Sequence, residues 1–388
     1  MSPLHRAGSR FALLFLVALP ARIGSAQATC TPHPPAVRFT EVDGARIQYL
    51  DWGGTGTGLA FLAGLGDSPH AYDEIAPCFT GRFHVIAIAR RGHGGSEAHP
   101  PFDVATGASD LAAVLDQAGI RRAVLVGWSM GGDEAADFAV RWPERVAGVV
   151  FLDSYDLSDP GYASMFAHYP ASFDTDTSAL ASPDAFRRWW KRTAAPDVPW
   201  SPAMRGEVND LFVTLPDGRV RPTLSDSLQM TFIKALMAFH PEYAKIRAPV
   251  LAFQARPGPR TALERTMPDS IERKIDRWTR EEMVPWQDSS HARFRRALPA
   301  ARVVFLDRTR HSALPFQARD AIVGNMRPFL DSLPARWRRF VIARPAGPKQ
   351  SRRLRSGLPR DCFGPLAALG VLAMTVRATT RATPGCRL

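Results

Sequence analysis

The stretch Val124-Leu-Val-Gly-Trp-Ser-Met-Gly-Gly132 decides the fold of this chain. An apolar run leads into Gly127-x-Ser129-x-Gly131, and a helical segment is predicted directly after it, over residues 133–141. A serine on a sharp strand-to-helix turn sits in strained backbone space, and small flanking residues let the chain close while its Oγ projects freely. The pattern predicts a nucleophilic Ser129, and the alternative is a plain turn serine in a protein without catalytic activity.

Short apolar runs and helix-length segments alternate on both sides of this turn. Residues 37–42 and 46–52, joined at Asp43-Gly44, predict a hairpin. Six apolar runs resemble strands covered on both faces: residues 59–63, 84–89, 123–127, 146–152, 249–253 and 302–306. Amphipathic helical segments, such as residues 105–118 and 316–333, accompany them. This βαβα order predicts an α/β fold whose mainly parallel sheet is flanked by helices.

The connection over residues 154–247 is too long for a simple loop. It is rich in large apolar side chains, and Leu228, Phe232 and Leu236 recur at helical spacing. A structureless loop of this size is uncommon inside a compact domain. We therefore predict a mostly helical cap inserted into an α/β core that consists of residues 29–153 and 248–335.

The basic balance of the chain comes from its two ends. The whole chain carries 49 Lys and Arg against 37 Asp and Glu, a net charge of +12. Residues 336–388 hold twelve of these bases and one acid, whereas residues 29–335 hold 34 bases and 36 acids. The central region is thus near neutral, and no nucleic-acid partner is expected. The basic tail, residues 336–388, predicts a disordered appendage, with weak contact to an anionic membrane as the alternative.

The first 28 residues have the pattern of a secretory signal peptide. His5, Arg6 and Arg10 precede an apolar run over residues 11–19, and Ala26-Gln27-Ala28 offers a small-x-small cleavage site. Nine apolar residues are too few to span a bilayer, which takes about 20. Export to the periplasm or the extracellular space is therefore expected, and an uncleaved amphipathic start is the alternative.

Export would permit a disulfide between Cys30 and Cys78, the two cysteines of the near-neutral region. A bond forms only if the Cα atoms of the two residues come within bonding range, which sequence spacing does not determine. A disulfide and two separate thiols both stay open.

Three further stretches carry a family resemblance. Ala63-Gly-Leu-Gly66 follows the third predicted strand, Arg90-Arg-Gly-His-Gly-Gly-Ser96 the fourth, and Arg310-His-Ser312 the last. With the Ser129 turn, they make residues 37–335 resemble an α/β-hydrolase of the serine-nucleophile esterase branch. The resemblance implies that His311 is the catalytic histidine and that the N–H groups of Leu65 and Met130 hold the oxyanion.

Two departures from the family pattern stand out. Ala63 replaces the histidine that usually opens the oxyanion loop, although the backbone N–H that the chemistry needs is kept. The usual position of the catalytic acid, after residues 249–253, holds no carboxylate. Some relatives, including haloalkane dehalogenases, carry the acid after the preceding strand, which here selects Asp153. Asp156 and Asp307 are the alternatives.

The expected chemistry needs only water. The chain contains no HExxH, paired CxxC, GxxxxGK[ST] or strand-borne GxGxxG, so we expect no metal and no cofactor. The resemblance implies hydrolysis of a small carboxylic ester or related acyl compound through an acyl-enzyme. C–C bond hydrolysis, perhydrolysis and a non-catalytic binding role are the alternatives, and the oligomeric state stays open.

Overall fold

The computed structural model describes residues 30–170, 177–258, 264–266 and 268–334. The predicted signal peptide and the whole of the predicted basic tail therefore lie outside the described residues. The strands are β1 (Ala36–Val42), β2 (Ala45–Gly53), β3 (Gly58–Leu62), β4 (His84–Ile88), β5 (Ala123–Trp128), β6 (Val146–Leu152), β7 (Phe212–Thr214), β8 (Val220–Pro222), β9 (Val250–Ala255) and β10 (Arg302–Leu306).

Eight of these strands form one sheet in the order β1-β2-β4-β3-β5-β6-β9-β10. β1 and β2 form the predicted hairpin, and β2 also pairs with β4 in antiparallel register. From β4 to β10 every neighbouring pair is parallel. The predicted mainly parallel α/β sheet is confirmed, with strand bounds within about two residues of those expected.

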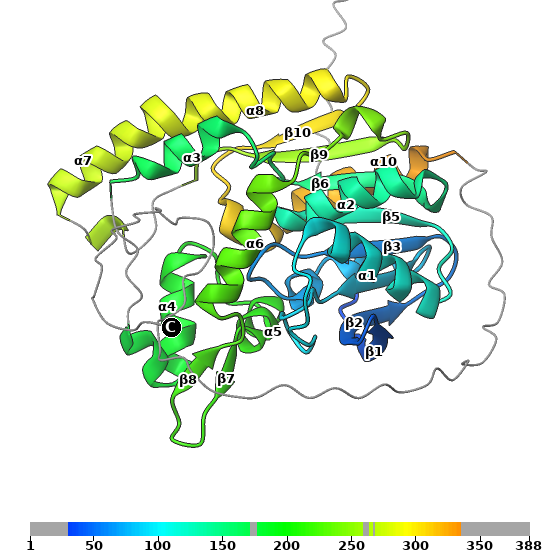
Figure 1. Cartoon of the computed structure of the whole chain (residues 1–388), viewed down its shortest axis with the longest axis horizontal. Coiled ribbons are helices and arrows are strands. Elements are labelled where there is room, and N and C mark those ends of the chain that lie inside the picture. The colour runs from blue at the N-terminus through cyan, green and yellow to red at the C-terminus, as the bar shows by residue number, and fades with distance from the viewer. Residues whose placement is uncertain (1–29, 171–176, 259–263, 267, 335–388) are drawn as a thin grey trace, which may run out of the picture.

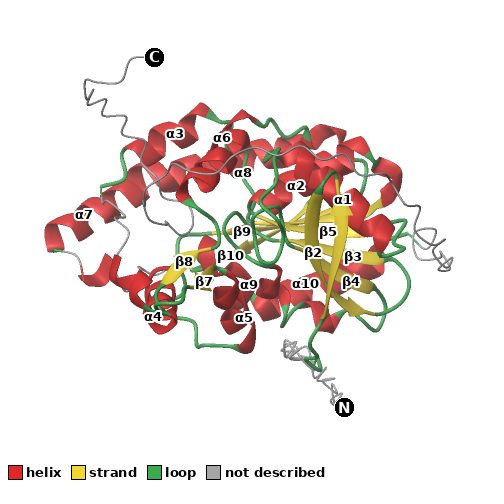
Figure 2. Ribbon diagram, turned by 60° about the horizontal axis from the view of Figure 1, so that its bottom comes forward, coloured by secondary structure: helices red, strands yellow, loops and turns green. Residues whose placement is uncertain are grey.

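Helices cover both faces of this sheet (Figures 1 and 2). Successive strand residues point to opposite faces: Val124 and Val126 pack toward α10, whereas Leu125 packs toward α1 and α2. The helices are α1 (Val104–Gln117), α2 (Met130–Arg141), α3 (Pro160–Ala167), α4 (Pro183–Thr193), α5 (Pro202–Asp210), α6 (Asp226–Ala238), α7 (Asp269–Trp278), α8 (Val284–Ala297), α9 (Leu314–Gln317) and α10 (Arg319–Ser332). This layering leaves the carboxyl ends of the parallel strands as the open edge for a site.

Residues 154–247, here called the cap segment, join β6 to β9 and contain helices α3 to α6. Serines start three of these helices, because the side chains of Ser182, Ser201 and Ser225 accept the N–H of the third residue that follows each. The cap segment also contains the small β7–β8 hairpin, which the sequence analysis did not predict, since three-residue strands are too short to show a clear alternation. α4, β7 and β8 lie at one end of the molecule (Figure 1).

Cys30 and Cys78 form a disulfide, with their Cα atoms 4.6 Å apart. This bond ties the start of the described chain to the segment between β3 and β4. Within the described residues, we find no helix with the length and apolarity that a bilayer crossing requires.

Candidate active site

Ser129 occupies the turn between β5 and α2 in a conformation that few side chains adopt, with φ 52° and ψ −123°. Its flanking glycines are required by close contacts, because a Cβ on Gly127 would collide with the Gly131 carbonyl, and one on Gly131 with the Leu62 carbonyl. The turn therefore stores backbone strain that only small neighbours tolerate. It places the serine Oγ at the carboxyl edge of the sheet.

His311 lies directly beside this serine. Its Nε2 is 2.9 Å from Ser129 Oγ, and its Nδ1 is 2.7 Å from Asp153 Oδ2. The indole Nε1 of Trp128 donates to the His311 carbonyl at 3.1 Å and fixes the backbone of the loop after β10. The structure thus brings the three predicted side chains, from the ends of β5, β6 and β10, into one hydrogen-bonded chain.

Asp153 is held from two further sides. Its Oδ1 accepts the Tyr155 hydroxyl at 2.7 Å and the Ala255 N–H at 2.8 Å, and the residue is 1 % exposed. Ala255 ends β9, where the family usually carries the acid, so this strand end supplies a backbone donor to the relocated carboxylate. Burial and the neighbouring Asp153 raise the pKa of Tyr155 well above its usual value, so Tyr155 remains a hydroxyl donor.

The two alternative acids lie elsewhere. Asp156 accepts hydrogen bonds from the backbone and hydroxyl of Ser158. Asp307 is exposed and pairs with Arg256 at 2.8 Å. Of the three aspartates considered from sequence, Asp153 is the one that the structure joins to His311.

The oxyanion loop, residues 63–67, passes over Ser129. Within the described part of the chain, neither the Leu65 N–H nor the Met130 N–H donates a hydrogen bond to another group, which leaves both available to a substrate oxygen. The next N–H, that of Gly66, is taken by His93 Nε2 at 3.0 Å. The His93 Nδ1–H is directed at the Arg91 carbonyl, and burial together with Arg90 lowers the pKa of His93 to about 3. His93 is therefore neutral and stabilises this turn.

A buried ion pair braces the oxyanion loop from below. Arg90 binds Glu134 through two nitrogens, at 2.5 and 2.8 Å, and donates its remaining N–H groups to the carbonyls of Ala63 and Gly64 at 2.8 and 3.0 Å. Both charged side chains are less than a tenth exposed. Arg90 thus holds the oxyanion loop at Ala63 and Gly64.

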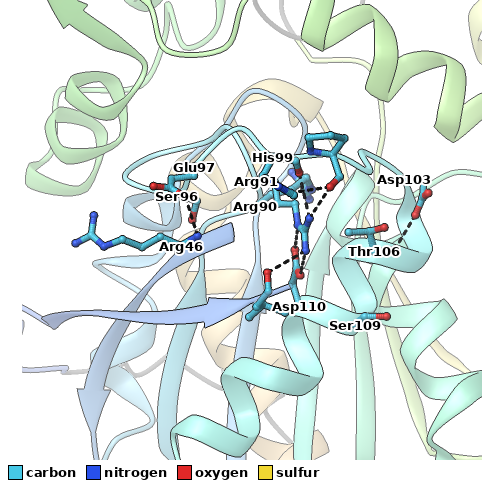
Figure 3. Close-up of polar contacts among 12 residues, drawn as sticks. Arg46, Arg90, Arg91, Ser96, Glu97, His99, Asp103, Thr106, Ser109 and Asp110 are labelled. Carbon is cyan, nitrogen blue, oxygen red and sulfur yellow. Dashed lines mark hydrogen bonds and ion pairs between the residues drawn. The ribbon is translucent and has the colours of Figure 1, made fainter. Parts of the chain in front are cut away.

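Arg91 stabilises the same turn from the other side. It makes two 2.8 Å contacts with Asp110 of α1 and donates to the carbonyls of His99 and Pro100, as Figure 3 shows for the labelled partners. Ser96, at the end of the turn, donates to the Ala89 carbonyl at 2.7 Å. The turn formed by residues 91–96 therefore supports the site from outside, because its hydrogen bonds go to neighbouring backbone and to α1 and none is made with Ser129 among the described residues.

Comparisons with known proteins agree with the observed fold. The family model for the alpha/beta hydrolase fold matches residues 59–314, more than half of the chain. The chain belongs to this family. A non-heme chloroperoxidase of Streptomyces lividans is 37 % identical over 119 residues, which cover 30 % of this chain and 43 % of that protein. A pimeloyl-[acyl-carrier protein] methyl ester esterase of Neisseria meningitidis serogroup B is 33 % identical over 94 residues, which cover 24 % of this chain and 35 % of that protein.

Among solved structures, that of an E-2-(acetamidomethylene)succinate hydrolase is similar to this α/β-hydrolase with a TM-score of 0.59 and 18 % sequence identity, covering 77 % of this chain and all of the other. This similarity concerns the fold. The aligned regions span less than half the length of the two curated relatives above.

Two supports of this α/β-hydrolase site were not predicted from sequence. Arg90 stands in a quoted motif and Glu134 in the helical segment predicted over residues 133–141, but neither pattern indicates that the two residues pair. Tyr155 follows Asp153 by two residues, and its hydroxyl turns back to the carboxylate because the backbone of Asp153 has a positive φ of 52°.

Proposed function

We propose that this protein is a serine hydrolase that cleaves carboxylic esters, or closely related acyl compounds, through an acyl-enzyme. The observation that carries the proposal is the unbroken contact from Ser129 through His311 to Asp153. A histidine held between a serine and a buried carboxylate is the arrangement that activates a serine nucleophile.

In the proposed mechanism Ser129 Oγ attacks the acyl carbonyl while His311 Nε2 accepts its proton. The N–H groups of Leu65 and Met130 stabilise the oxyanion, and the helix that starts at Met130 adds its positive end. His311 then protonates the leaving alcohol, and the acyl group stays on Ser129. Water attacks this ester with His311 again as the base, which releases the acid and restores the serine. Asp153 keeps the Nδ1–H of His311 oriented throughout.

The esterase relative supports ester cleavage, and the serine nucleophile argues against epoxide opening, which uses a carboxylate at this position. A second candidate is perhydrolysis, in which hydrogen peroxide replaces water as the acceptor of the same acyl group. The chloroperoxidase relative favours this candidate. Both candidates share the acyl-enzyme, so one experiment tests their common step.

That experiment combines the Ser129→Ala variant with a panel of short p-nitrophenyl esters. We expect kcat to fall about 10⁴-fold or more, because the nucleophile is removed. The circular dichroism spectrum should stay unchanged, and a fluorophosphonate should label the wild type at Ser129 alone. Ser158→Ala is the control and should retain activity and labelling. Hydrolysis by Ser129→Ala at the wild-type rate would contradict the mechanism.

We further propose that the protein is exported to an oxidising compartment, because the Cys30–Cys78 disulfide is typical of such proteins. Intact-mass analysis of the protein from the periplasm or medium should show cleavage after Ala28 or Ala26. Retention of Met1 would contradict this proposal.

A further inference from the structure

A pocket lies between the oxyanion loop and the cap segment, next to the candidate active site. Gly66, Asp67 and His93 line it on the core side. Asp67 is 4 % exposed, and it reaches back toward the serine: a Cβ on Gly64 would collide with Asp67 Oδ2 and lie 3.5 Å from Ser129 Cβ. Asp67 is thus close both to Ser129 and to the pocket that it lines.

Aromatic side chains of α4 form the opposite wall of the pocket. Phe186, Trp189 and Trp190 all line it, and Trp190 stacks on Trp200, which fixes its ring. Phe186 packs on both Trp189 and Phe212. Such rigid aromatic faces carry negative potential and attract a cation that lies within about 6 Å of a ring centroid.

Carboxyl groups outnumber basic groups around the pocket. Asp67 and Asp210 line it, no Lys or Arg does so among the described residues, and His93 is neutral. Behind Asp67 lies Glu207 of α5, which is fully buried and accepts the Ser68 N–H at 3.0 Å. Arg90, whose charge acts on Asp67, is already paired with Glu134, and Arg187 of α4 binds Asp184 and Asn209.

His70 is the histidine next to Asp210. Its Nδ1 is 2.8 Å from Asp73 Oδ2 and its Nε2 is 3.8 Å from Asp210 Oδ2, so one imidazole ring lies between two carboxyl groups. Within the described residues, Asp210 Oδ2 is buried without a hydrogen-bond donor. The acidic groups on this side of the site thus outnumber their partners.

An independent observation comes from the cap helix α6. Gln229 lines the same pocket, and the residue is 6 % exposed. Across the described part of the chain, no hydrogen bond to its amide group is present. The amide atoms are not among the fully enclosed polar atoms without a partner, so the group is open to the pocket and can bind a ligand there.

We propose that this pocket binds a primary ammonium group of the ester substrate, held by Asp67, Asp210 and the Gln229 carbonyl against the aromatic wall of α4. The inference rests on the proposed ester hydrolysis and names its substrate class. An ammonium group supplies three N–H donors, which matches two carboxylates and one amide oxygen. The aromatic wall favours an organic cation.

The test compares two methyl esters of the same shape, methyl 6-aminohexanoate and methyl heptanoate, which differ by an ammonium group in place of a methyl group. Hydrolysis is followed at pH 8, where Asp67 is largely ionised because its pKa is about 7. We expect kcat/KM to be about tenfold or more higher for the amino ester. The Asp210→Asn and Gln229→Leu variants should each reduce this ratio toward one. Asp217→Asn, which removes an exposed carboxylate of the cap segment, should leave it unchanged.

The outcomes separate the inference from the proposed function. Hydrolysis of both esters with a ratio at or below one overturns the ammonium site and leaves ester hydrolysis standing. A high ratio that both pocket variants retain also overturns the assignment. If neither ester is cleaved, calorimetry with n-hexylammonium decides: saturable binding that Asp210→Asn weakens about tenfold, and Asp217→Asn does not, supports the site, and the absence of binding refutes it.

Discussion

Asp153 and Asp67 are buried carboxylates at the same edge of the sheet, 1 % and 4 % exposed, and each follows a parallel strand. Asp153 meets three donors, from His311, Tyr155 and the Ala255 backbone. Asp67 instead faces a second buried carboxyl, that of Glu207. Two carboxyl groups with similar burial therefore differ in their hydrogen-bond donors: Asp153 has three, and Asp67 has fewer.

This difference has a thermodynamic cause. Moving a carboxylate out of water is unfavourable unless hydrogen bonds or charges replace the lost hydration. Burial raises the pKa of Asp67 to about 7, even though His311 and Arg90 lower it, and burial together with Asp67 raises the pKa of Glu207. We infer that Asp153 orients His311, whereas Asp67 is stabilised by binding either a proton or a cationic ligand.

The comparison predicts its largest effect at Asp153. Asp153→Asn keeps the size of the side chain but offers the wrong partner to His311 Nδ1–H, so kcat should fall by about 10⁴-fold on p-nitrophenyl esters. Asp156→Asn and Asp307→Asn are matched controls at the two other aspartates and should stay near the wild-type rate. If Asp153→Asn is as active as the wild type while Asp307→Asn is inactive, the acid has been assigned to the wrong residue.

A third buried carboxylate, Glu134, sharpens the comparison because an arginine neutralises it. Glu134→Gln leaves Arg90 buried without its charge partner, and we expect the free energy of unfolding to fall by about 3 kcal/mol. The oxyanion loop loses its brace as well, so kcat should fall more than KM rises, by about tenfold. Both effects are measurable by urea denaturation and steady-state kinetics.

The same helix offers a control for this variant. Asp137→Asn removes the partner of Arg141, whose side chain is 37 % exposed, and should cost less than about 1 kcal/mol with kcat unchanged. Equal losses in the two variants would mean that the Arg90–Glu134 pair has no special role in the site.

The sheet and the three site residues were predictable because each follows from local pattern. Apolar runs mark strands covered on both faces; Ser129 and Asp153 come directly after such runs, and His311 lies in the loop that follows the last one. The supports were not predictable, since Arg90–Glu134 and Asp67–Glu207 join residues 44 and 140 positions apart and depend on how α2 and α5 pack. Donor counts around a buried carboxylate are a property of packing, and a motif does not encode them.

The smallest predicted effect concerns Asp67 and the pH dependence of the free energy of unfolding. The folded-state pKa of Asp67, about 7, lies above the ordinary value of 3.8, so the folded state binds this proton more tightly than the unfolded chain. Ionisation therefore reduces stability as the pH rises from about 4 to about 7. The Asp67→Asn side chain cannot ionise and still offers an N–H to Glu207. The free energy of unfolding of this variant, relative to that of the wild type, should therefore be about 2 kcal/mol higher at pH 8 than at pH 5. Urea denaturation at both pH values measures this difference, and Asp184→Asn, an exposed control, should behave alike at both. A stability difference between Asp67→Asn and the wild type that does not depend on pH would mean that Asp67 is as well satisfied as Asp153, which would remove the contrast between the two carboxylates.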